Sequence, residues 1–443
     1  MTPYSEEIWD ERELWSRDRI ADFQLDALKR QLAYVHEHSR FYRRRFDEAG
    51  FAPGDLRGLD DLARLPTTRK ADYVAALEEE PPWGTALALD LADVRRVHYS
   101  SGTTARPAPV AWSAADLDRW TDLYARSAYS QGVRAHDVYQ CLFGFSWFVG
   151  GLGVMASYER IGCTCIPGGN TDSKRQLDTM FHYGTTAVGG TPSFALHLIE
   201  VAAEMGVDLR DTQVSSVMVG GEPGGSIPAT RERIEDCWGA ACYDGYGSHE
   251  FQPIAWDCRA QRGGHLAEDF LYAEVVDIET GEPVPDGTPG VLVLTHLDKQ
   301  ACPMVRWWTG DVVVRDASPC ACGRTHARLP GGVRGRADDM LIVRGVNVFP
   351  SAVEQVIRRT PGCTGEYAIV VSDDLRDPAT GYLTGLNVRV EAAQDATEGL
   401  VDDLTAAIRA ELTVRANVEL VPPNSLPRSG HKAKRVIEET QRA

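Results

Sequence analysis

Residues 98–107 read His98-Tyr99-Ser100-Ser101-Gly102-Thr103-Thr104-Ala105-Arg106-Pro107. Small and hydroxylated residues here follow a predicted strand, and such a loop lets backbone N–H groups and hydroxyls approach a polyphosphate closely. The spacing and the missing lysine distinguish it from the Gly-x4-Gly-Lys-Ser/Thr loop of the common nucleotide triphosphatases. Taken alone, this composition is also typical of an ordinary turn, so the rest of the chain must decide between the two interpretations.

The residues around this loop predict a layered α/β domain. Between about residues 94 and 225, short apolar runs such as 214–219 end in glycine-rich turns and alternate with helical stretches such as 113–130. Towards the N-terminus, apolar residues at helical spacing in 25–38 predict an exposed amphipathic helix.

A β-rich subdomain and a small α+β unit are predicted to follow. Strand-like runs at 271–278 and 290–294 are separated by turn signals. The rhythm changes again after Arg334-Gly335-Arg336-Ala337-Asp338-Asp339. The elements predicted beyond it are a helix over 351–359, strands near 367–371 and 383–390, and a helix near 399–412. We therefore predict a large N-terminal domain, 1–335, and a small C-terminal domain, 336–443.

Composition narrows the class of protein. A chain of 443 residues exceeds what one core usually serves, and 43% hydrophobic with 25% charged residues is typical of globular proteins. A formal net charge of -18 disfavours nucleic acid as a partner. The acidic N-terminus does not resemble a targeting signal, and no window approaches the about 18 apolar residues of a membrane-spanning helix. We expect a cytoplasmic protein without a membrane partner.

Five further motifs follow the loop in order. They are Gly220-Gly221-Glu222-Pro223, Tyr246-Gly247-Ser248-His249-Glu250, Trp308-Thr309-Gly310-Asp311, residues 334–350 and residues 427–436. The set resembles the adenylate-forming superfamily of acyl-CoA synthetases and adenylation domains. Within it, residues 338–351 and Gly430-His431-Lys432-Ala433-Lys434-Arg435-Val436 are similar to the phenylacetate-CoA ligase branch. The resemblance runs from about Leu25 to the end of the chain and implies the adenylate-forming enzyme fold with a mobile C-terminal domain.

The resemblance implies where ATP binds. The nucleotide-binding residues expected in the N-terminal domain are Ser100, Ser101, Gly102, Thr103, Thr104, Gly221, Glu222, Tyr246, Gly247 and Asp311. The 100–104 loop would hold the β- and γ-phosphates, and Glu250 would help to bind the Mg2+ that offsets their charge. Tyr246 and Gly247 would flank the adenine and the α-phosphate. Asp311 would accept charge-assisted hydrogen bonds from the ribose hydroxyls.

The remaining implied roles lie near or in the C-terminal domain. Lys432 matches the catalytic lysine that reaches the α-phosphate while the substrate carboxylate attacks it and pyrophosphate leaves. Arg336 would contact phosphate or ribose, and Asp338 matches the hinge. Gly345, which lacks a Cβ, would let the pantetheine arm of coenzyme A pass to the acyl-adenylate.

Two positions depart from the family pattern. Ala105-Arg106 stands where Gly-Lys is usual, and a planar guanidinium meets phosphate differently from a compact ammonium. His249 stands where Thr or Ser is usual. It either faces the substrate or is a packed histidine with its hydrogen bonds satisfied, and we expect the packed state.

The acid pocket is expected near the segment 143–151 and near Gly220. The predicted substrate-binding residues are Phe143, Ser146, Trp147, Phe148, Gly151 and Gly220. Aromatic walls suit an aryl acid, because aromatic pairs gain about 0.5–1.5 kcal/mol beyond burial, and glycines would admit a flat ring. A buried core strand is the alternative for Trp147 and Phe148. Phenylacetate, benzoate and anthranilate types of acid all remain open.

Three of the ten cysteines and one histidine have metal-ligand spacing. Cys258 and His265 are close in sequence, and Cys320-Ala321-Cys322 follows later. Three sulfurs and an imidazole can close a tetrahedral structural Zn2+ site without an open catalytic position. Four unligated residues are the alternative interpretation.

We therefore predict an aryl-CoA ligase of the AMP-forming type that uses ATP, Mg2+ and coenzyme A. A stand-alone adenylation enzyme that passes the acid to a carrier protein thiol or an amine is the alternative. A non-catalytic binding protein is disfavoured because Lys432, Glu250 and Asp311 are all present. A homodimer stays open.

Overall fold

The computed structural model describes residues 8–99, 108–344, 346–378, 380–394, 396, 398–426 and 435–439. The chain divides into two compact units. The first contains the described residues up to Ser226 together with Arg233–Thr309 and Val313–Gly332. The second contains Ile227–Glu232, Gly310–Val312 and the described residues from Val333 onward. The precise domain boundary between residues 335 and 336 stays a prediction.

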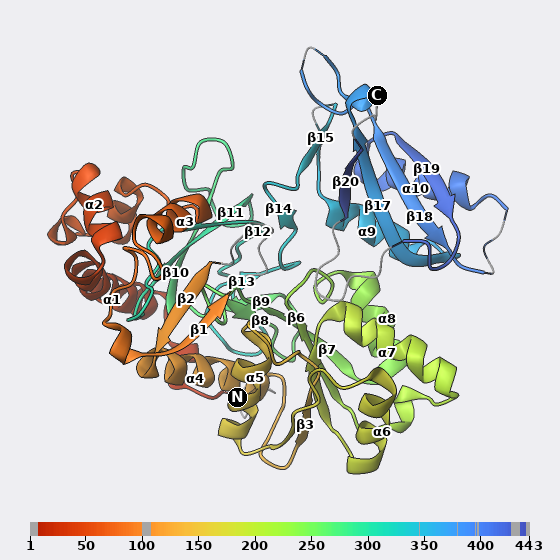
Figure 1. Ribbon diagram of the computed structural model, residues 1–443, viewed down its shortest axis with the longest axis horizontal. Helices are drawn as coiled ribbons and strands as arrows, with labels where there is room; N and C mark the ends of the chain where they lie inside the picture. The colour runs from red at the N-terminus through yellow and green to blue at the C-terminus, as the bar shows by residue number, and fades with distance from the viewer. Residues whose placement is uncertain are drawn as a thin grey trace. The chain divides into compact units, whose positions relative to one another are not determined.

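A mixed sheet forms the centre of the first unit, in the order β13-β9-β8-β7-β6-β5-β3-β4 (Figure 1). Its strands are β3 (Val138–Cys141), β4 (Thr164–Ile166), β5 (Ala187–Gly190), β6 (Ser216–Gly220), β7 (Ala241–Tyr246), β8 (Ala255–Trp256), β9 (Gly264–Leu266) and β13 (Arg328–Leu329). Neighbours from β4 to β7 are parallel, whereas β8, β9 and β13 pair antiparallel. Parallel neighbours require crossover connections, here made by helices, so the layered α/β prediction is confirmed.

Helices cover both faces of this sheet (Figure 1). They are α4 (Ala114–Ser130), α5 (Gly150–Ile161), α6 (Ser173–Tyr183), α7 (Pro192–Met205) and α8 (Pro228–Trp238). Successive side chains of a strand point to opposite faces. Val188 and Val217 accordingly pack with apolar residues of α6, α7 and α8, while Ala187 and Met218 pack with residues of α4 and α5.

Local sequence signals set the ends of these helices. Ser113 and Asp116 form a capping box at the start of α4, with each side chain accepting the other's backbone N–H. Thr191 accepts the N–H of Phe194 at the start of α7. Glycines in the left-handed conformation end α5, α6 and α7, because this conformation costs glycine little.

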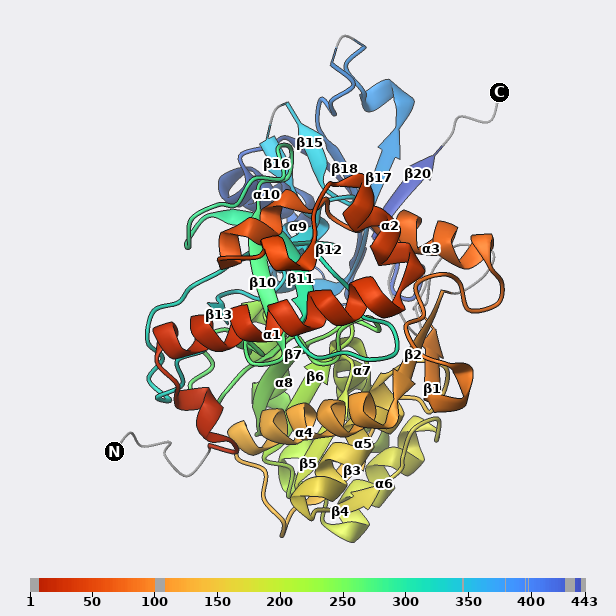
Figure 2. The same ribbon diagram turned by 90° about the vertical axis from the view of Figure 1, so that its left-hand side faces the viewer.

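The rest of the first unit is helical at its start and β-rich later. Its helices are α1 (Arg17–His38), α2 (Arg40–Glu48) and α3 (Lys70–Glu79). Its strands are β1 (Val94–Tyr99), β2 (Pro109–Ser113), β10 (Leu271–Val276), β11 (Pro289–His296) and β12 (Trp307–Val314), of which Gly310–Val312 belong to the second unit. β1 and β2 form an antiparallel pair, and β10, β11 and β12 are neighbours in a second sheet, which confirms the β-rich prediction. Helix α1 crosses in front of this sheet in Figure 2, where the Gln24 and Gln31 amides donate to the carbonyls of Glu268 and Lys299.

The second unit is a small α+β fold. Its elements are β14 (Gly335–Arg336), β15 (Leu341–Val343), β16 (Val346–Val348), α9 (Pro350–Arg359), β17 (Cys363–Ser372), β18 (Leu386–Ala392), α10 (Leu400–Leu412), β19 (Ala416–Val421) and β20 (Val436–Glu439). The sheet order is β19-β18-β17-β20. Ile357 of α9 and Leu404 of α10 are buried with Ile369 and Val388 of the sheet, so both helices share its core. None of the helices in the described part of the chain is both long and apolar enough to cross a membrane.

Candidate active site and metal site

Loops at one edge of the parallel strands carry many of the predicted site residues. Residues 143–151 follow β3, residues 220–222 end or follow β6, and residues 246–250 end or follow β7. These strands lie in the parallel part of one sheet, and the carboxyl ends of parallel strands share an edge (Figure 1). Ligands of α/β proteins commonly bind at this edge. The fold thus brings three separately predicted motifs to one side of the sheet.

Several predicted residues cannot be placed. The loop residues Ser100, Ser101, Gly102, Thr103 and Thr104, the departure Ala105-Arg106, and Gly345 and Lys432 lie outside the described residues. Their roles in binding phosphate, coenzyme A and the transition state stay predictions.

The glycines at 220 and 221 have different structural reasons. Gly220 lies opposite Gly245 in the β6–β7 register, and an added Cβ would lie 2.5 Å from the Gly245 carbonyl oxygen. Close approach of two strands therefore explains Gly220. Gly221 has a φ of 88°, which an L side chain rarely adopts. Beyond it, a Glu222 carboxylate oxygen accepts the backbone N–H of Ser193 at 2.8 Å, which joins this loop to the start of α7.

Glu250 is a buried carboxylate paired with its neighbour in sequence. The His249 Nδ1 lies 3.0 Å from a Glu250 carboxylate oxygen, and both side chains are largely shielded from solvent. Burial alone would raise the pKa of Glu250, but the His249 imidazole and the Ser248 side chain lower it to about 2. Glu250 is therefore ionised at neutral pH, as a ligand for Mg2+ must be. His249 is a packed residue with a hydrogen bond, as expected.

The strand end at Tyr246 is supported by a short polar network. The Tyr246 carbonyl accepts the N–H of Ile254 at 2.9 Å. An added Cβ at Gly247 would lie 3.1 Å from the Gln252 amide oxygen, and the Tyr124 hydroxyl donates to that same oxygen. Gly247 thus lets a buried polar group approach the backbone where the nucleotide is predicted to bind.

The predicted acid segment is anchored at its ends and exposed at its tip. Phe143 and Phe145 pack against the core beneath α5, whereas Ser146 is exposed and Trp147 is 65% exposed. Trp147 is therefore not a buried core residue. An added Cβ at Gly151 would lie 2.7 Å from the Gly144 carbonyl oxygen. The missing side chain at Gly151 thus has a reason within the fold, and contact of Gly151 with the acid stays a prediction.

Asp311, Arg336 and Asp338 form one ion-pair set in the second unit. Arg336 Nη1 donates to Asp311 at 3.1 Å, and Arg336 Nε donates to Asp338 at 2.8 Å. Gly310 has a φ of 78°, and an added Cβ there would lie 2.8 Å from Arg336 Nη2. The predicted ribose ligand, nucleotide ligand and hinge residue are therefore direct neighbours.

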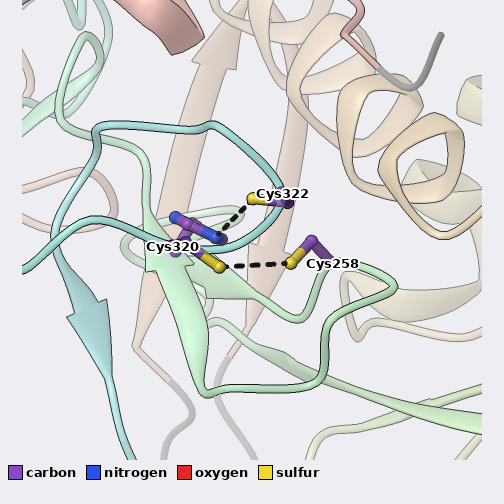
Figure 3. A group of neighbouring side chains, drawn as sticks. Cys258, Cys320 and Cys322 are labelled. Carbon is purple, nitrogen blue, oxygen red and sulfur yellow. Dashed lines mark hydrogen bonds between the residues drawn. The ribbon is translucent and has the colours of Figure 1, made fainter. Parts of the chain in front are cut away.

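The four predicted metal ligands are gathered in one buried cluster. The candidate ligand atoms of Cys258, His265, Cys320 and Cys322 all lie within 4.8 Å of one another. The sulfurs of Cys258 and Cys320 face each other at 3.9 Å, and the sulfur of Cys322 lies 3.4 Å from His265 Nε2 (Figure 3). A disulfide needs sulfurs about 2.05 Å apart, so Cys258 and Cys320 are separate thiols.

These distances match a tetrahedral zinc site. Two sulfurs each about 2.3 Å from zinc at tetrahedral angles lie about 3.8 Å apart, and a sulfur and an imidazole nitrogen lie about 3.6 Å apart. The observed 3.9 Å and 3.4 Å are close to both values. The residues present therefore fit the metal predicted for them.

Surrounding groups prepare the ligands. His265 Nδ1 lies 3.0 Å from the His326 carbonyl oxygen, which can only accept, so Nδ1 carries the proton and Nε2 keeps its lone pair. The Arg324 backbone N–H donates to the Cys322 sulfur at 3.5 Å. A hydrogen bond from Cys258, followed by one from Cys322, lowers the pKa of Cys320. The same shared hydrogen bonds raise the pKa of Cys258, so these contacts favour a thiolate, the form that binds zinc, at Cys320.

The sequence did not point to some residues of these sites. His98 contacts the acid segment, and His326 and Arg324 support the metal ligands. His98 stands in the quoted phosphate-loop motif, but only the fold reveals its partner. The support at His326 and Arg324 uses backbone atoms, which leave no signature in residue type.

Comparisons with known proteins match this arrangement. Residues 56–296 match the family described as AMP-binding enzyme, and residues 345–440 match its C-terminal domain family. A phenylacetate-coenzyme A ligase of Thermus thermophilus is 36% identical over 97% of this chain and 98% of its own length. That of Escherichia coli is 34% identical over 97% of each.

Solved structures agree. The crystal structure of a 2-hydroxyisobutyryl-CoA ligase in the postadenylation state superposes with a TM-score of 0.92 at 32% identity, covering 99% of this chain and 94% of that chain. The adenylate-forming fold and the phenylacetate-CoA ligase-like sequence are thereby confirmed. The chain belongs to the AMP-binding enzyme family.

Proposed function

We propose that this protein is an AMP-forming ligase that joins a small aromatic carboxylic acid to coenzyme A at the expense of ATP. The observation that carries the proposal is the full-length match to phenylacetate-coenzyme A ligases at 34–36% identity. The alternative, transfer to a carrier protein or an amine, is not favoured because these relatives, matched over nearly all their length, are coenzyme A ligases.

The proposed reaction has two steps, adenylation of the acid and transfer of the acyl group to coenzyme A. In the first, an oxygen of the acid's carboxylate attacks the α-phosphorus of ATP, the bond to the β-phosphate breaks, and pyrophosphate leaves. In the second, the thiol sulfur of coenzyme A attacks the acyl carbon, loses its proton, and AMP leaves with the bonding electrons. Lys432 is proposed to stabilise the charge on the α-phosphate, worth about 10²–10³ in rate for one such contact.

The described residues support binding of the nucleotide. Glu250 is ionised and fixed by His249, so it is ready to hold Mg2+ beside the phosphates. Asp311 keeps one carboxylate oxygen on Arg336, and a carboxylate has further lone pairs for the ribose hydroxyls. Tyr246 and Gly247 are proposed to flank the adenine.

The acid is proposed to lie against the aromatic segment. Phe143, Trp147 and Phe148 offer ring faces, and Ser146 offers a hydroxyl beside them. Because the solved relative acts on an aliphatic hydroxy acid, 2-hydroxyisobutyrate is the sharpest non-aromatic comparison.

We also propose that Cys258, His265, Cys320 and Cys322 hold one structural Zn2+. The ligand set is complete, so the ion would cross-link two loops and leave no position for substrate. The matching separations and the fixed imidazole tautomer support the assignment.

Acid-dependent exchange of labelled pyrophosphate into ATP tests the first step. The panel contains phenylacetate, benzoate, anthranilate and 2-hydroxyisobutyrate, with Lys432→Ala as the comparison. Exchange with an aryl acid that falls by about 10² or more in the variant supports the proposal. Exchange that is strongest with 2-hydroxyisobutyrate contradicts the aromatic class, and equal exchange in the variant contradicts the role of Lys432.

Thioester formation tests the second step. With the preferred acid and ATP, we expect stoichiometric loss of coenzyme A thiol and appearance of AMP. Acyl-adenylate that accumulates without consuming the thiol would instead point to another acceptor.

A further inference from the structure

The carbonyl oxygen of Trp147 is held from β1 by two groups. The backbone N–H of Tyr99 donates to it at 3.2 Å, and His98 Nδ1 lies 3.0 Å away. A carbonyl oxygen only accepts, so Nδ1 carries a proton and the His98 ring is fixed in one tautomer. Two donors on one oxygen hold the backbone at the exposed tip of the acid segment.

The His98 ring is itself held in place. It is 2% exposed and packs edge-on against Trp120, with ring centroids 5.3 Å apart. Trp120 in turn fills the space above Gly153 of α5, where an added Cβ would lie 2.2 Å from the indole. Because α5 begins at Gly150, within the acid segment 143–151, both the Trp147 carbonyl and Gly153 belong to one continuous stretch of chain.

The ring is neutral at physiological pH. Burial lowers the pKa of His98, the hydrogen bond to the Trp147 carbonyl opposes this, and the charge of Arg96 lowers it further. A neutral imidazole has a single N–H, and here the Trp147 carbonyl takes it.

We infer that His98 is a positioning residue for the acid. Through the Trp147 carbonyl it sets where the Trp147 indole stands, with the Tyr99 ring 5.7 Å from the indole as its aromatic neighbour. The inference rests on the proposed function, in which residues 143–151 line the acid pocket. It predicts that the N–H on Nδ1, and not the bulk of the ring, determines the affinity for the acid.

Two amide substitutions separate these properties. The nitrogen of Asn can take the place of Nδ1, whereas the nitrogen of Gln takes the place of Nε2. Both substitutions remove the ring, so each is the other's control. In pyrophosphate exchange we expect His98→Gln to raise KM for the acid about tenfold, the worth of one hydrogen bond, and His98→Asn to stay near wild type. KM for ATP should be equal in the two variants.

Equal acid KM values in the Asn and Gln variants would overturn the inference and leave His98 as a packing residue. A shift in KM for ATP as large as that for the acid would overturn it as well. Trp147→Ala separates the role of His98 from the assignment of residues 143–151 to the acid pocket. If it raises the acid KM while the amide variants agree with each other, only the role of His98 fails. If it leaves the acid KM unchanged, the acid-pocket assignment fails and the inference with it.

A measurement on the unsubstituted protein covers the case in which neither variant folds. In protein with ¹⁵N-labelled histidine, the His98 ring should appear as the neutral tautomer that carries its proton on Nδ1 and none on Nε2. Its Nδ1 signal should shift when the preferred acid is added. His265 is also protonated at Nδ1 and serves as an internal reference that the acid leaves unmoved. If no histidine Nδ1 signal shifts when the acid is added, the inference is overturned.

Discussion

His296 is a buried imidazole that contacts the backbone of Glu250, the residue proposed here to bind Mg2+. It stacks on Phe251 at 3.9 Å and meets the edge of Phe270, and its Nδ1 accepts the Met304 N–H at 3.0 Å. Burial lowers its pKa well below 6.5, and the charge of Lys299 acts in the same direction, against backbone hydrogen bonds with Glu250 and Met304. The folded chain therefore keeps His296 neutral under conditions in which the unfolded chain protonates it.

Stability should depend on pH through His296. Below about pH 6.5 the His296 imidazole binds a proton in the unfolded chain but not in the folded chain. The free energy of unfolding therefore falls by about 1.4 kcal/mol for each pH unit that the pH is lowered. Above pH 6.5 both states are neutral and the contribution is flat. Urea unfolding of wild type and His296→Phe between pH 5 and 7.5 should show a shallower slope in the variant. Parallel curves would mean that His296 titrates normally in the fold.

The sequence indicated candidate site residues, but it did not indicate which side chains they pair with in the folded protein. The family resemblance pointed to Glu250, and ligand spacing pointed to Cys258, His265, Cys320 and Cys322, which the fold gathers in one cluster. The pairing of His249 with Glu250 depends on side-chain conformation, and the buried pair Arg126–Asp269 joins residues 143 positions apart. No local pattern announces such long-range partners.

At the scale of elements, α4 and α5 are held together by a glycine. An added Cβ at Gly153 would lie 2.2 Å from Trp120, closer than any real contact. Gly153→Ala should therefore lower the free energy of unfolding by about 1–3 kcal/mol through overpacking. Gly58→Ala is the matched control, because an added Cβ there meets nothing within 4 Å. Thermal unfolding of both variants checks this, and a loss of equal size in the two would place the effect in the backbone instead.

The loop that carries two of the proposed metal ligands, Cys320 and Cys322, also contacts residues 12–15. Arg324, whose N–H donates to Cys322, forms a buried ion pair with Glu13, and both side chains are 2% exposed. The Thr325 N–H donates to the Glu13 carbonyl at 3.0 Å, and His326 Nε2 lies 3.1 Å from the Arg12 carbonyl. Residues 324–326 thus contact both the N-terminal segment and the cluster of proposed metal ligands.

Removing the metal should loosen that segment. We expect a zinc chelator, or Cys320→Ser, to speed tryptic cleavage after Arg12 and Arg17, whose side chains are now held by ion pairs with Asp10 and Glu268. Peptide mass spectrometry over time measures the rate. Cys237→Ser, which changes a half-buried cysteine outside the cluster, should cleave like wild type. Unchanged cleavage in chelator would argue against the zinc assignment or its link to this segment.

Element boundaries were predicted best where caps and turns are local. The helix expected over 113–130 is α4 with Ser113 as its cap, and that expected over 351–359 is α9. The strand expected to begin at Leu383 begins instead at Leu386, because the Leu383 N–H donates to the carbonyl of Ile342 in β15. Apolar periodicity cannot tell which neighbour a strand residue will choose.

At the scale of the whole molecule, the second unit is proposed to serve both half-reactions, with Lys432 acting in the first and Gly345 in the second. Asp338 lies in the second unit and pairs with Arg336. A hinge must change its backbone angles, and proline fixes φ near -65°.

Substituting this position should therefore separate the two steps. Asp338→Pro should keep much of the pyrophosphate exchange, while thioester formation should fall by about 10² or more. Only the second step requires the C-terminal domain to turn about the proposed hinge at Asp338. Asp338→Asn, which keeps an acceptor for Arg336 and a free φ, should retain both activities. An equal loss of both steps in the proline variant would show that Asp338 is not a hinge.

The ion pair between Glu13 and Arg324 also constrains the order of events during synthesis. The two residues are 311 positions apart. At about 5–20 residues per second, a ribosome needs about 15–60 s to deliver the arginine after the glutamate. Until then the Glu13 carboxylate has only its local partners, the backbone N–H groups of Trp9 and Asp10, and lacks the cation that compensates its burial. The buried ion pair that holds residues 12 and 13 can therefore form only after nearly all of the larger unit has been synthesised.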